Sequence, residues 1–210
     1  MDLFAQLDTV SSRHDVLRHP FYQRWSAGEL TRSELAVYAG QYHHAVVALA
    51  DAAQAAASSA DEPQLRAQLE RHADEEREHV ALWEEFAAVV GGRTDDAPAP
   101  ETEACAQAWA GDAERPLLQS LVALYAVEAA QPAISQTKRV GLAEHYGIEG
   151  EGSAYFDLHE TLDVHHAQAG RALIQERLEG ADEDALVAEA ESVLRANWEL
   201  LDGVERLNGR

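Results

Sequence analysis

An apolar stripe with ionisable residues at its centre is the feature that most constrains how this chain can fold. Between residues 65 and 90, side chains at alternating four- and three-residue spacing share one face of a long helix. The face reads Leu65, Leu69, His72, Glu76, His79, Trp83, Phe86 and Val90. Because both ends of the face are apolar, we expect its middle to point inward as well. A buried carboxylate without a partner is costly, so something must compensate the charge of Glu76.

Two later segments show the same interruption. After Pro116, three leucines define a face, and the next residue on that face is Glu128. After Ser153, the inward face holds Phe156, His159, Asp163, His166, Gly170 and Leu173. Almost every window of the chain has helical rather than strand periodicity. The sequence therefore predicts an all-α bundle of seven or eight helices, in one domain that covers residues 1–210.

Capping and breaking residues predict where these helices begin and end. The string Thr31-Arg-Ser-Glu34 is a capping box that opens a long helix running to about Ser59. Pro63 begins the next helix, which ends at Gly91-Gly92. The other helices are expected at about 2–17, 20–26, 102–110, 116–146 with an interruption near Pro132, 153–178 and 182–207.

The composition excludes several classes of function. With 38 acidic and 16 basic residues and a net charge of −22, the surface repels phosphate groups, so we expect neither a nucleic-acid nor a membrane partner. No apolar run approaches the ~20 residues that span a bilayer, and no signal pattern opens the chain, which predicts a cytoplasmic protein. The single cysteine, Cys105, excludes an intramolecular disulfide and any multi-cysteine metal site.

The inward-facing ionisable groups form a candidate set of metal ligands. The set contains Glu76, His79, Glu128, His159, Asp163 and His166. Three carboxylates with three imidazoles suit iron, manganese or zinc better than calcium or magnesium. Carboxylate-x-x-His pairs on the faces of two helices are a pattern by which helical bundles hold two metal ions. The alternative is a hydrogen-bonded network that absorbs one or two of these groups, and His72 is either a supporting residue or part of the core.

Several strings of residues resemble one known group of proteins. The string from His19 to Trp25, HPFYQRW, is similar to the N-terminal signature of the haem-oxygenase-like proteins that include thiaminase II and pyrroloquinoline-quinone synthase C. The ligand pattern resembles that of the haem-oxygenase-like di-metal oxidases and oxygenases, which activate O2 without haem. Its parts here are EExxHxxLW ending at Trp83, ExxxP ending at Pro132, and HxxxDxxH ending at His166. The resemblance implies a haem-oxygenase-like (TenA/PqqC-like) bundle.

Within that group the chain looks most like the CADD-like enzymes, which make p-aminobenzoate for folate synthesis. In those enzymes a tyrosine side chain supplies the aromatic ring and a lysine supplies the amino nitrogen. The resemblance assigns these roles to Tyr22 and to Lys138, the only lysine of the chain, which stands ten residues after Glu128. The run Ala154-Tyr155-Phe156 also matches the family pattern, which implies an auxiliary redox role for Tyr155.

The resemblance implies a non-haem, O2-dependent oxidoreductase. Its cofactors would be two divalent ions, Fe(II) and/or Mn(II), held by the six candidate ligands, with O2 as co-substrate, an external reductant and a homodimeric assembly. The resemblance to the CADD-like enzymes implies that p-aminobenzoate is made from the protein's own Tyr22 and Lys138. The interval from Glu76 to His79 is shorter than in the CADD-like pattern, and fatty-acid-decarboxylating relatives use this shorter spacing. Val127 stands where the CADD-like pattern carries a tyrosine.

Other functions stay open at this point. The same di-metal oxygenase could act on an external small substrate, such as a fatty acid or an amino acid. A metal-free protein similar to PqqC or thiaminase II would instead bind a flat heterocycle. A non-enzymatic bundle would bind metal without reacting with O2.

The net charge of −22 leads to a prediction about salt. An acidic composition with a single lysine is typical of proteins adapted to a salty cytoplasm, or reflects a GC-rich genome. Added KCl screens the self-repulsion of the folded chain, so we expect the melting temperature to rise with KCl concentration. Thermal unfolding followed by circular dichroism measures this. A melting temperature that falls steadily as KCl rises would contradict the prediction.

Overall fold

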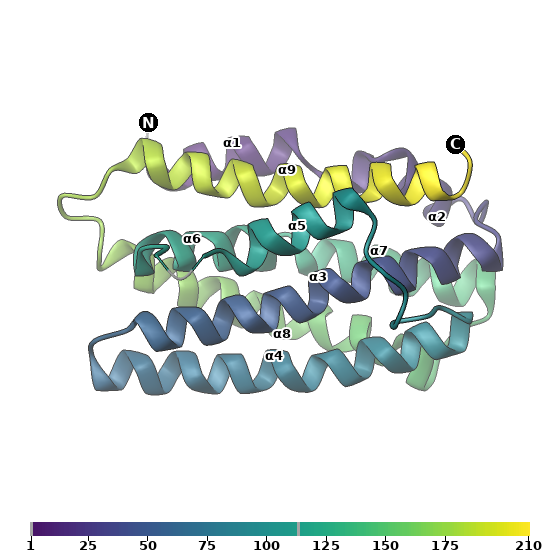
Figure 1. The fold of residues 1–210 in the computed structure, drawn as a ribbon, viewed down its shortest axis with the longest axis horizontal. Helices are drawn as coiled ribbons and strands as arrows, with labels where there is room; N and C mark the ends of the chain where they lie inside the picture. The colour runs from purple at the N-terminus through teal and green to yellow at the C-terminus, as the bar shows by residue number, and fades with distance from the viewer. Residues whose placement is uncertain (1, 113) are drawn as a thin grey trace.

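Long helices that lie side by side along one axis make up the computed structural model in Figure 1. The structure describes residues 2–112 and 114–210. Within these residues the α-helices are α1 (Leu3–Arg13), α2 (Pro20–Ser26), α3 (Arg32–Ser59), α4 (Pro63–Val90), α5 (Pro100–Ala110), α6 (Leu117–Glu128), α7 (Gln131–Gly141), α8 (Ala154–Gln175) and α9 (Glu183–Leu207). The all-α class is confirmed, and the described residues contain no strand.

The predicted start and stop signals of the two longest helices are present in the structure. Thr31 caps α3: its hydroxyl accepts from the Glu34 amide, and the Glu34 carboxylate accepts from the Thr31 amide at 2.8 Å. Pro63 begins α4, and Gly91 ends it with a φ of 82°. That left-handed conformation suits glycine because a Cβ would be strained there.

Two helices differ from their predicted extents. The first ends at Arg13 rather than near residue 17, because the Asp15 side chain accepts from the Leu17 amide and opens a 3₁₀ turn at Val16–Arg18. The predicted helix over 116–146 is two α-helices and a π turn at Leu142–Tyr146, with the break between Glu128 and Gln131. Pro132 lies in the first turn of α7, where a missing amide proton costs little.

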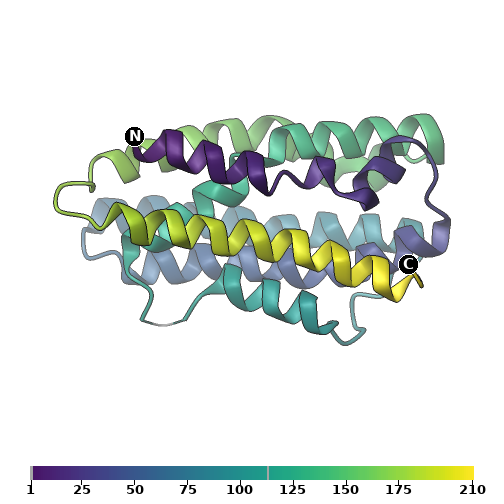
Figure 2. The same cartoon turned by 90° about the horizontal axis from the view of Figure 1, so that it is seen from above.

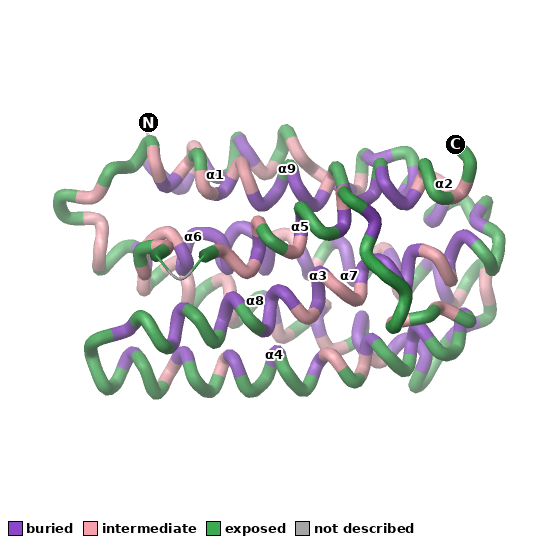
Figure 3. Tube along the Cα trace, viewed as in Figure 1, coloured by how far each residue is buried: buried purple, intermediate pink, exposed green. Residues whose placement is uncertain are grey.

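The helices pack as layers whose inner faces form the core. In Figures 1 and 2, α3 and α4 run antiparallel beside each other, and α9 runs along the opposite side of the bundle next to α1. Figure 3 shows buried segments recurring along each long helix on the side that faces its neighbours. Aromatic rings fill the core where α2, α3, α4 and α8 meet, with Trp25, Tyr38 and Phe156 all buried.

The stretch Leu117–Tyr146 corrects the expectation that no apolar run of the chain approaches the length that spans a bilayer. It contains an 18-residue window with a mean hydropathy of 1.3, which is apolar enough by length and composition to cross a membrane. However, 61% of that window is buried inside the bundle, and the stretch carries both Glu128 and Lys138. We therefore assign it to the core of the bundle rather than to a membrane span.

The helix that carries Tyr22 is fixed at both ends. At its start, the His19 ring accepts from the Phe21 amide at 3.1 Å through Nδ1, while Nε2 lies 3.1 Å from Asp202. Near its end, the Trp25 indole donates to the Lys138 carbonyl at 3.1 Å. These contacts tie α2 to α9 and to α7, and they thereby fix the position of the Tyr22 backbone relative to Lys138.

A half-buried ion network joins α2 to α3 and α9. Arg24 donates to Glu34 at 2.6 Å and to Glu205 at 2.5 Å. Burial alone would raise the pKa of Glu34, but the hydrogen bonds from Thr31 and Arg24 outweigh it and lower that pKa from 4.5 to about 2. A carboxylate whose pKa is lower in the folded than in the unfolded protein stabilises the fold at pH values above its unfolded pKa. This contribution is lost as the pH falls through the folded-state pKa.

The Glu34→Gln variant tests this network. We expect it to lower the free energy of unfolding by about 2 kcal/mol at neutral pH, because a charge-assisted pair and a helix cap are weakened together. The difference from the parent should be complete above pH 4.5 and should shrink as the pH falls towards 2. Urea unfolding at several pH values measures it, and the exposed Glu29→Gln variant is the control. A difference that stays constant down to acid pH would contradict this account.

Candidate metal centre

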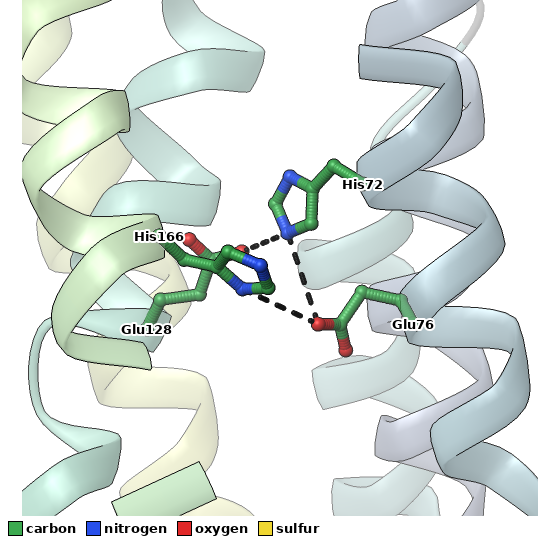
Figure 4. A group of neighbouring side chains, drawn as sticks. All are labelled: His72, Glu76, Glu128 and His166. Atoms are coloured by element: carbon green, nitrogen blue, oxygen red, sulfur yellow. Dashed lines mark ion pairs between the residues drawn. The ribbon is translucent and has the colours of Figure 1, made fainter. Parts of the chain in front are cut away.

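Four side chains from three helices converge in the interior of the bundle. His72 and Glu76 come from α4, Glu128 from α6 and His166 from α8, and Figure 4 shows them pointing toward one another. The Nε2 atom of His72 lies 2.9 Å from Glu128 Oε1 and 3.7 Å from Glu76 Oε1. The Nδ1 atom of His166 lies 3.8 Å from the same Glu76 oxygen.

A second group of donors lies next to the first and shares one residue with it. Glu76 Oε1 is 3.3 Å from His79 Nδ1, and the rings of His79 and His159 lie 4.6 Å apart. Within each group, the donor atoms are no more than 4.8 Å from one another. Asp163 lies beside both groups, with Oδ1 3.5 Å from His166 Nδ1. The geometry thus offers two adjacent groups that could each hold a cation, and Glu76 belongs to both.

Many polar atoms at this centre are buried without a hydrogen-bond partner. They are His72 Nε2, Glu76 Oε1, His79 Nδ1, Glu128 Oε1, His159 Nε2, both carboxyl oxygens of Asp163, and His166 Nδ1. Buried polar atoms in proteins nearly always have a hydrogen-bond partner. A cluster of polar atoms without one, all facing one another, therefore needs an explanation. Mixed carboxylate and imidazole ligands fit transition-metal ions, and two such ions would satisfy these atoms.

Outer contacts fix which ring nitrogen of two histidines faces the centre. His159 Nδ1 donates to the Tyr155 carbonyl at 2.7 Å, which leaves Nε2 free of a proton. His166 Nε2 lies 3.0 Å from Glu75 Oε2, which leaves Nδ1 to face Asp163 and Glu76. Metal-binding histidines are commonly oriented in this way by a carbonyl or a carboxylate. Glu75 was not predicted from the sequence, in which its only signal is its place beside Glu76.

The pKa values at the centre reflect crowded charges in a dry interior. Burial raises the pKa of Asp163 to about 7, and the charges of Glu128 and Glu76 add to this effect. Burial also opposes protonation of His72, yet the adjacent Glu128 carboxylate raises the pKa of that imidazole to about 11. Burial lowers the pKa of His159 to about 4. A bound cation would take over the role of these protons in balancing the carboxylates.

All six candidate ligands predicted from the sequence lie at this centre, and His72 lies among them. The sequence analysis left His72 open between a supporting residue and a core residue. Its Nε2 atom has no hydrogen-bond partner, lies within ion-pair distance of Glu128 and Glu76, and belongs to the four-residue donor group. Side-chain exposure is 16% for His72 and 12% for His166, whereas it is 2% for Glu76, so one side of the centre is nearer to solvent.

Lys138 and Tyr22 lie together in an aromatic cage. The lysine is 1% exposed, and its Nζ atom is 4.8–5.7 Å from five ring centroids. These rings belong to Tyr22, Tyr38, Tyr42, Trp83 and Phe156. Burial lowers the pKa of the Lys138 ammonium well below its ordinary value, which favours a neutral amine.

Tyr38 joins the two predicted residues, and the sequence analysis did not identify it. Its hydroxyl lies 2.9 Å from the Tyr22 hydroxyl and 2.7 Å from Lys138 Nζ. Burial raises the pKa of both phenols well above the ordinary value. The three groups therefore form an uninterrupted buried chain of exchangeable protons.

Tyr155 lies between the cage and the metal centre. Its ring stacks on His159 at 4.0 Å between centroids and meets the ring of Trp83 edge-on at 4.9 Å. Trp83 in turn forms part of the cage around Lys138. The predicted site residues thus form two neighbouring clusters joined through Tyr155.

Comparisons with known proteins agree on the fold and the family. A family model described as an iron-containing redox enzyme matches residues 38–198. The 4-aminobenzoate synthase of Chlamydia muridarum is 33% identical, over 96% of this chain and 89% of that protein. The 4-aminobenzoate synthase of Nitrosomonas europaea is 32% identical, over 95% of this chain and 89% of that protein.

Solved structures of low sequence identity share the fold. A domain of unknown function with a haem-oxygenase-like fold from Shewanella denitrificans matches with a TM-score of 0.82 and 20% identity, over 100% of this chain and 94% of that one. A TenA homologue from P. horikoshii matches with a TM-score of 0.81 and 15% identity, over 98% of this chain and 99% of that one. The predicted haem-oxygenase-like, TenA-like fold is confirmed. With the family match covering most of its length, the chain belongs to the family of iron-containing redox enzymes.

Proposed function

We propose that this protein is an O2-dependent di-metal oxidoreductase, with an Fe/Fe or Fe/Mn pair, that makes p-aminobenzoate from its own Tyr22 and Lys138. The observation that carries the proposal is the cage, in which the only lysine of the chain is buried against the ring of Tyr22. Relatives named 4-aminobenzoate synthase, at 31–33% identity, support the same product.

Seven side chains would hold the two metal ions. The set is Glu76, His79, Glu128, His159, Asp163 and His166, together with His72. The three carboxylates supply three negative charges against the four positive charges of two divalent ions, and the four imidazoles bind as neutral ligands. When bound, the metal pair would supply the electrons that convert O2 into an oxidant for the caged side chains, and an external reductant would return those electrons to the metals.

Lys138 supplies the amino nitrogen in this proposal. An amine must be unprotonated to act as a nucleophile, and complete burial among aromatic rings favours that form. The cage also holds the nitrogen 5.0 Å from the centre of the Tyr22 ring, so the two reacting groups need little rearrangement to meet.

Tyr38 provides a path for a proton within the cage. Lys138 Nζ donates to the Tyr38 hydroxyl, so the proton that the amine loses on forming its bond can pass to the Tyr38 oxygen while the Tyr38 proton passes to the Tyr22 oxygen. Such a relay keeps the ionisation of Tyr22 from leaving an unpaired charge in a dry interior. Tyr155 would act as the auxiliary redox residue, because its ring contacts both His159 and Trp83.

The contacts favour this proposal over the other functions considered. A metal-free, thiaminase-like activity would leave the unpaired donors at the centre unexplained. Burial raises the pKa of the single thiol, Cys105, which disfavours a nucleophilic role. An external fatty acid substrate would leave the burial of the only lysine against the ring of Tyr22 without a function.

Isotope labelling of the one lysine tests the proposal directly. Protein made with ¹⁵N-lysine carries that label in its chain only at Lys138. After incubation with Fe(II), Mn(II), a reductant and O2, we expect released p-aminobenzoate to contain ¹⁵N, in a yield of at most about one per chain. Mass spectrometry of the product measures the label, and peptide mapping should show mass changes at residues 22 and 138.

Variants separate self-consumption from catalysis on another substrate. Tyr22→Phe and Lys138→Met should keep their metal but release no product, whereas Tyr146→Phe, a tyrosine outside the cage, should release it normally. Unlabelled p-aminobenzoate, or many turnovers per chain, would overturn the roles of Tyr22 and Lys138 while leaving the metal centre intact.

A further inference from the structure

A small cavity opens beside the metal centre between α4, α6 and α8. Its volume is about 180 Å³, and it is bounded by the metal-facing side chains His72, Glu128 and His166. Leu121, Leu124 and Leu173 supply much of its wall. The cavity thus combines a largely apolar wall with three side chains whose inner atoms lack a hydrogen-bond partner, and the half-buried or exposed side chains of Gln68, Arg71 and Glu75 line it as well. We call it the side cavity.

The side cavity approaches the centre on its more exposed side. His72 and His166, which bound it, have 16% and 12% of their side chains exposed. His159, which belongs to the other donor group, is 1% exposed and does not line the cavity. The two metal positions are therefore unequal, because the position flanked by His72 and His166 is nearer to a route from solvent.

The residues that line the side cavity differ from those of the aromatic cage. Within the described part of the chain, the lining includes neither Tyr22 nor Lys138, nor Tyr38 or Trp83. A molecule in the cavity would therefore meet the metal-facing side chains without passing through the cage. This separation suits a co-substrate that reacts at the metals rather than one that replaces the caged side chains.

Gly170 keeps part of the side cavity free of side-chain atoms. It lies inside α8, where a glycine is less favourable than an alanine. A Cβ built on it would lie 3.7 Å from the nearest atom, on Tyr125, which is an ordinary contact. Packing therefore does not require a glycine at this position, and a longer side chain would extend into the cavity.

We propose that the side cavity is the port through which dioxygen reaches the metal position flanked by His72, Glu128 and His166. This inference rests on the di-metal centre of the proposed function. An apolar cavity of about 150 Å³ is large enough to admit benzene, so a diatomic gas fits the side cavity readily. Its leucine wall suits an apolar molecule, while the two histidines and the glutamate hold the ion that this molecule would meet.

A graded series at Gly170 tests the port, with nitric oxide as the probe in place of O2. Nitric oxide is a diatomic gas that binds ferrous iron with a change in absorbance, so its association is measured by anaerobic stopped-flow mixing with the Fe(II)-loaded protein. We expect Gly170→Ala to slow association measurably and Gly170→Leu to slow it at least tenfold. Ala172→Leu, an exposed position on the same helix, should leave the rate unchanged. Iron content should be equal in all four proteins.

The outcomes separate the port from the proposed function. If nitric oxide associates at equal rates with the parent and with Gly170→Leu, at equal iron content, the proposed port is contradicted. The proposal of a metal centre is not affected by that result. A parent protein that binds no iron would overturn the centre and the port together. If Gly170→Leu loses iron, the Gly170→Ala rate decides: slower association supports the port, and an unchanged rate overturns it.

Discussion

The burial of three carboxylates in one small volume is the constraint on which the rest of this structure depends. Glu76, Glu128 and Asp163 come from three different helices and are each at most 2% exposed. Their mutual repulsion in a dry interior would open the bundle unless positive charge were placed among them. In the proposed function two divalent metal ions supply that charge, and the outer contacts of His159 and His166 fix the direction in which each ring points. In this account, the metal ions are part of what holds α4, α6 and α8 together.

The site has two halves with different physical properties. The metal half is polar, crowded with unpaired donors and reached by a cavity, whereas the other half is an aromatic cage closed around one amine. Tyr155 and Trp83 join them, so in the proposed function an oxidising equivalent produced in the metal half would have a short aromatic path into the cage. The same separation keeps Lys138 away from the anionic ligands, and this helps to explain why its ammonium form is disfavoured.

The inward position of the six candidate ligands could be predicted because each lies on a helix face that is otherwise apolar, and periodicity reports such a face directly. Periodicity says little about distances between helices, so the contact of His72 with Glu128 could not be predicted.

Tyr38 was not identified from the sequence for a different reason. It lies in a run of α3 from residue 38 to 42 in which every residue is buried, so no stripe sets it apart. The break after Glu128 was only approximately located, because Pro132 is tolerated in the first turn of α7 and gives no unique boundary.

Elemental analysis of the purified protein tests the central claim most directly. The protein would be expressed with added iron and manganese and compared with His159→Ala and with the control His165→Ala, whose imidazole is exposed one residue before His166. The account predicts about two transition-metal ions per chain in the parent and in the control, and a clear loss in His159→Ala. The absence of metal from all three proteins would contradict it, and the buried carboxylates and histidines would then form a hydrogen-bonded pocket instead.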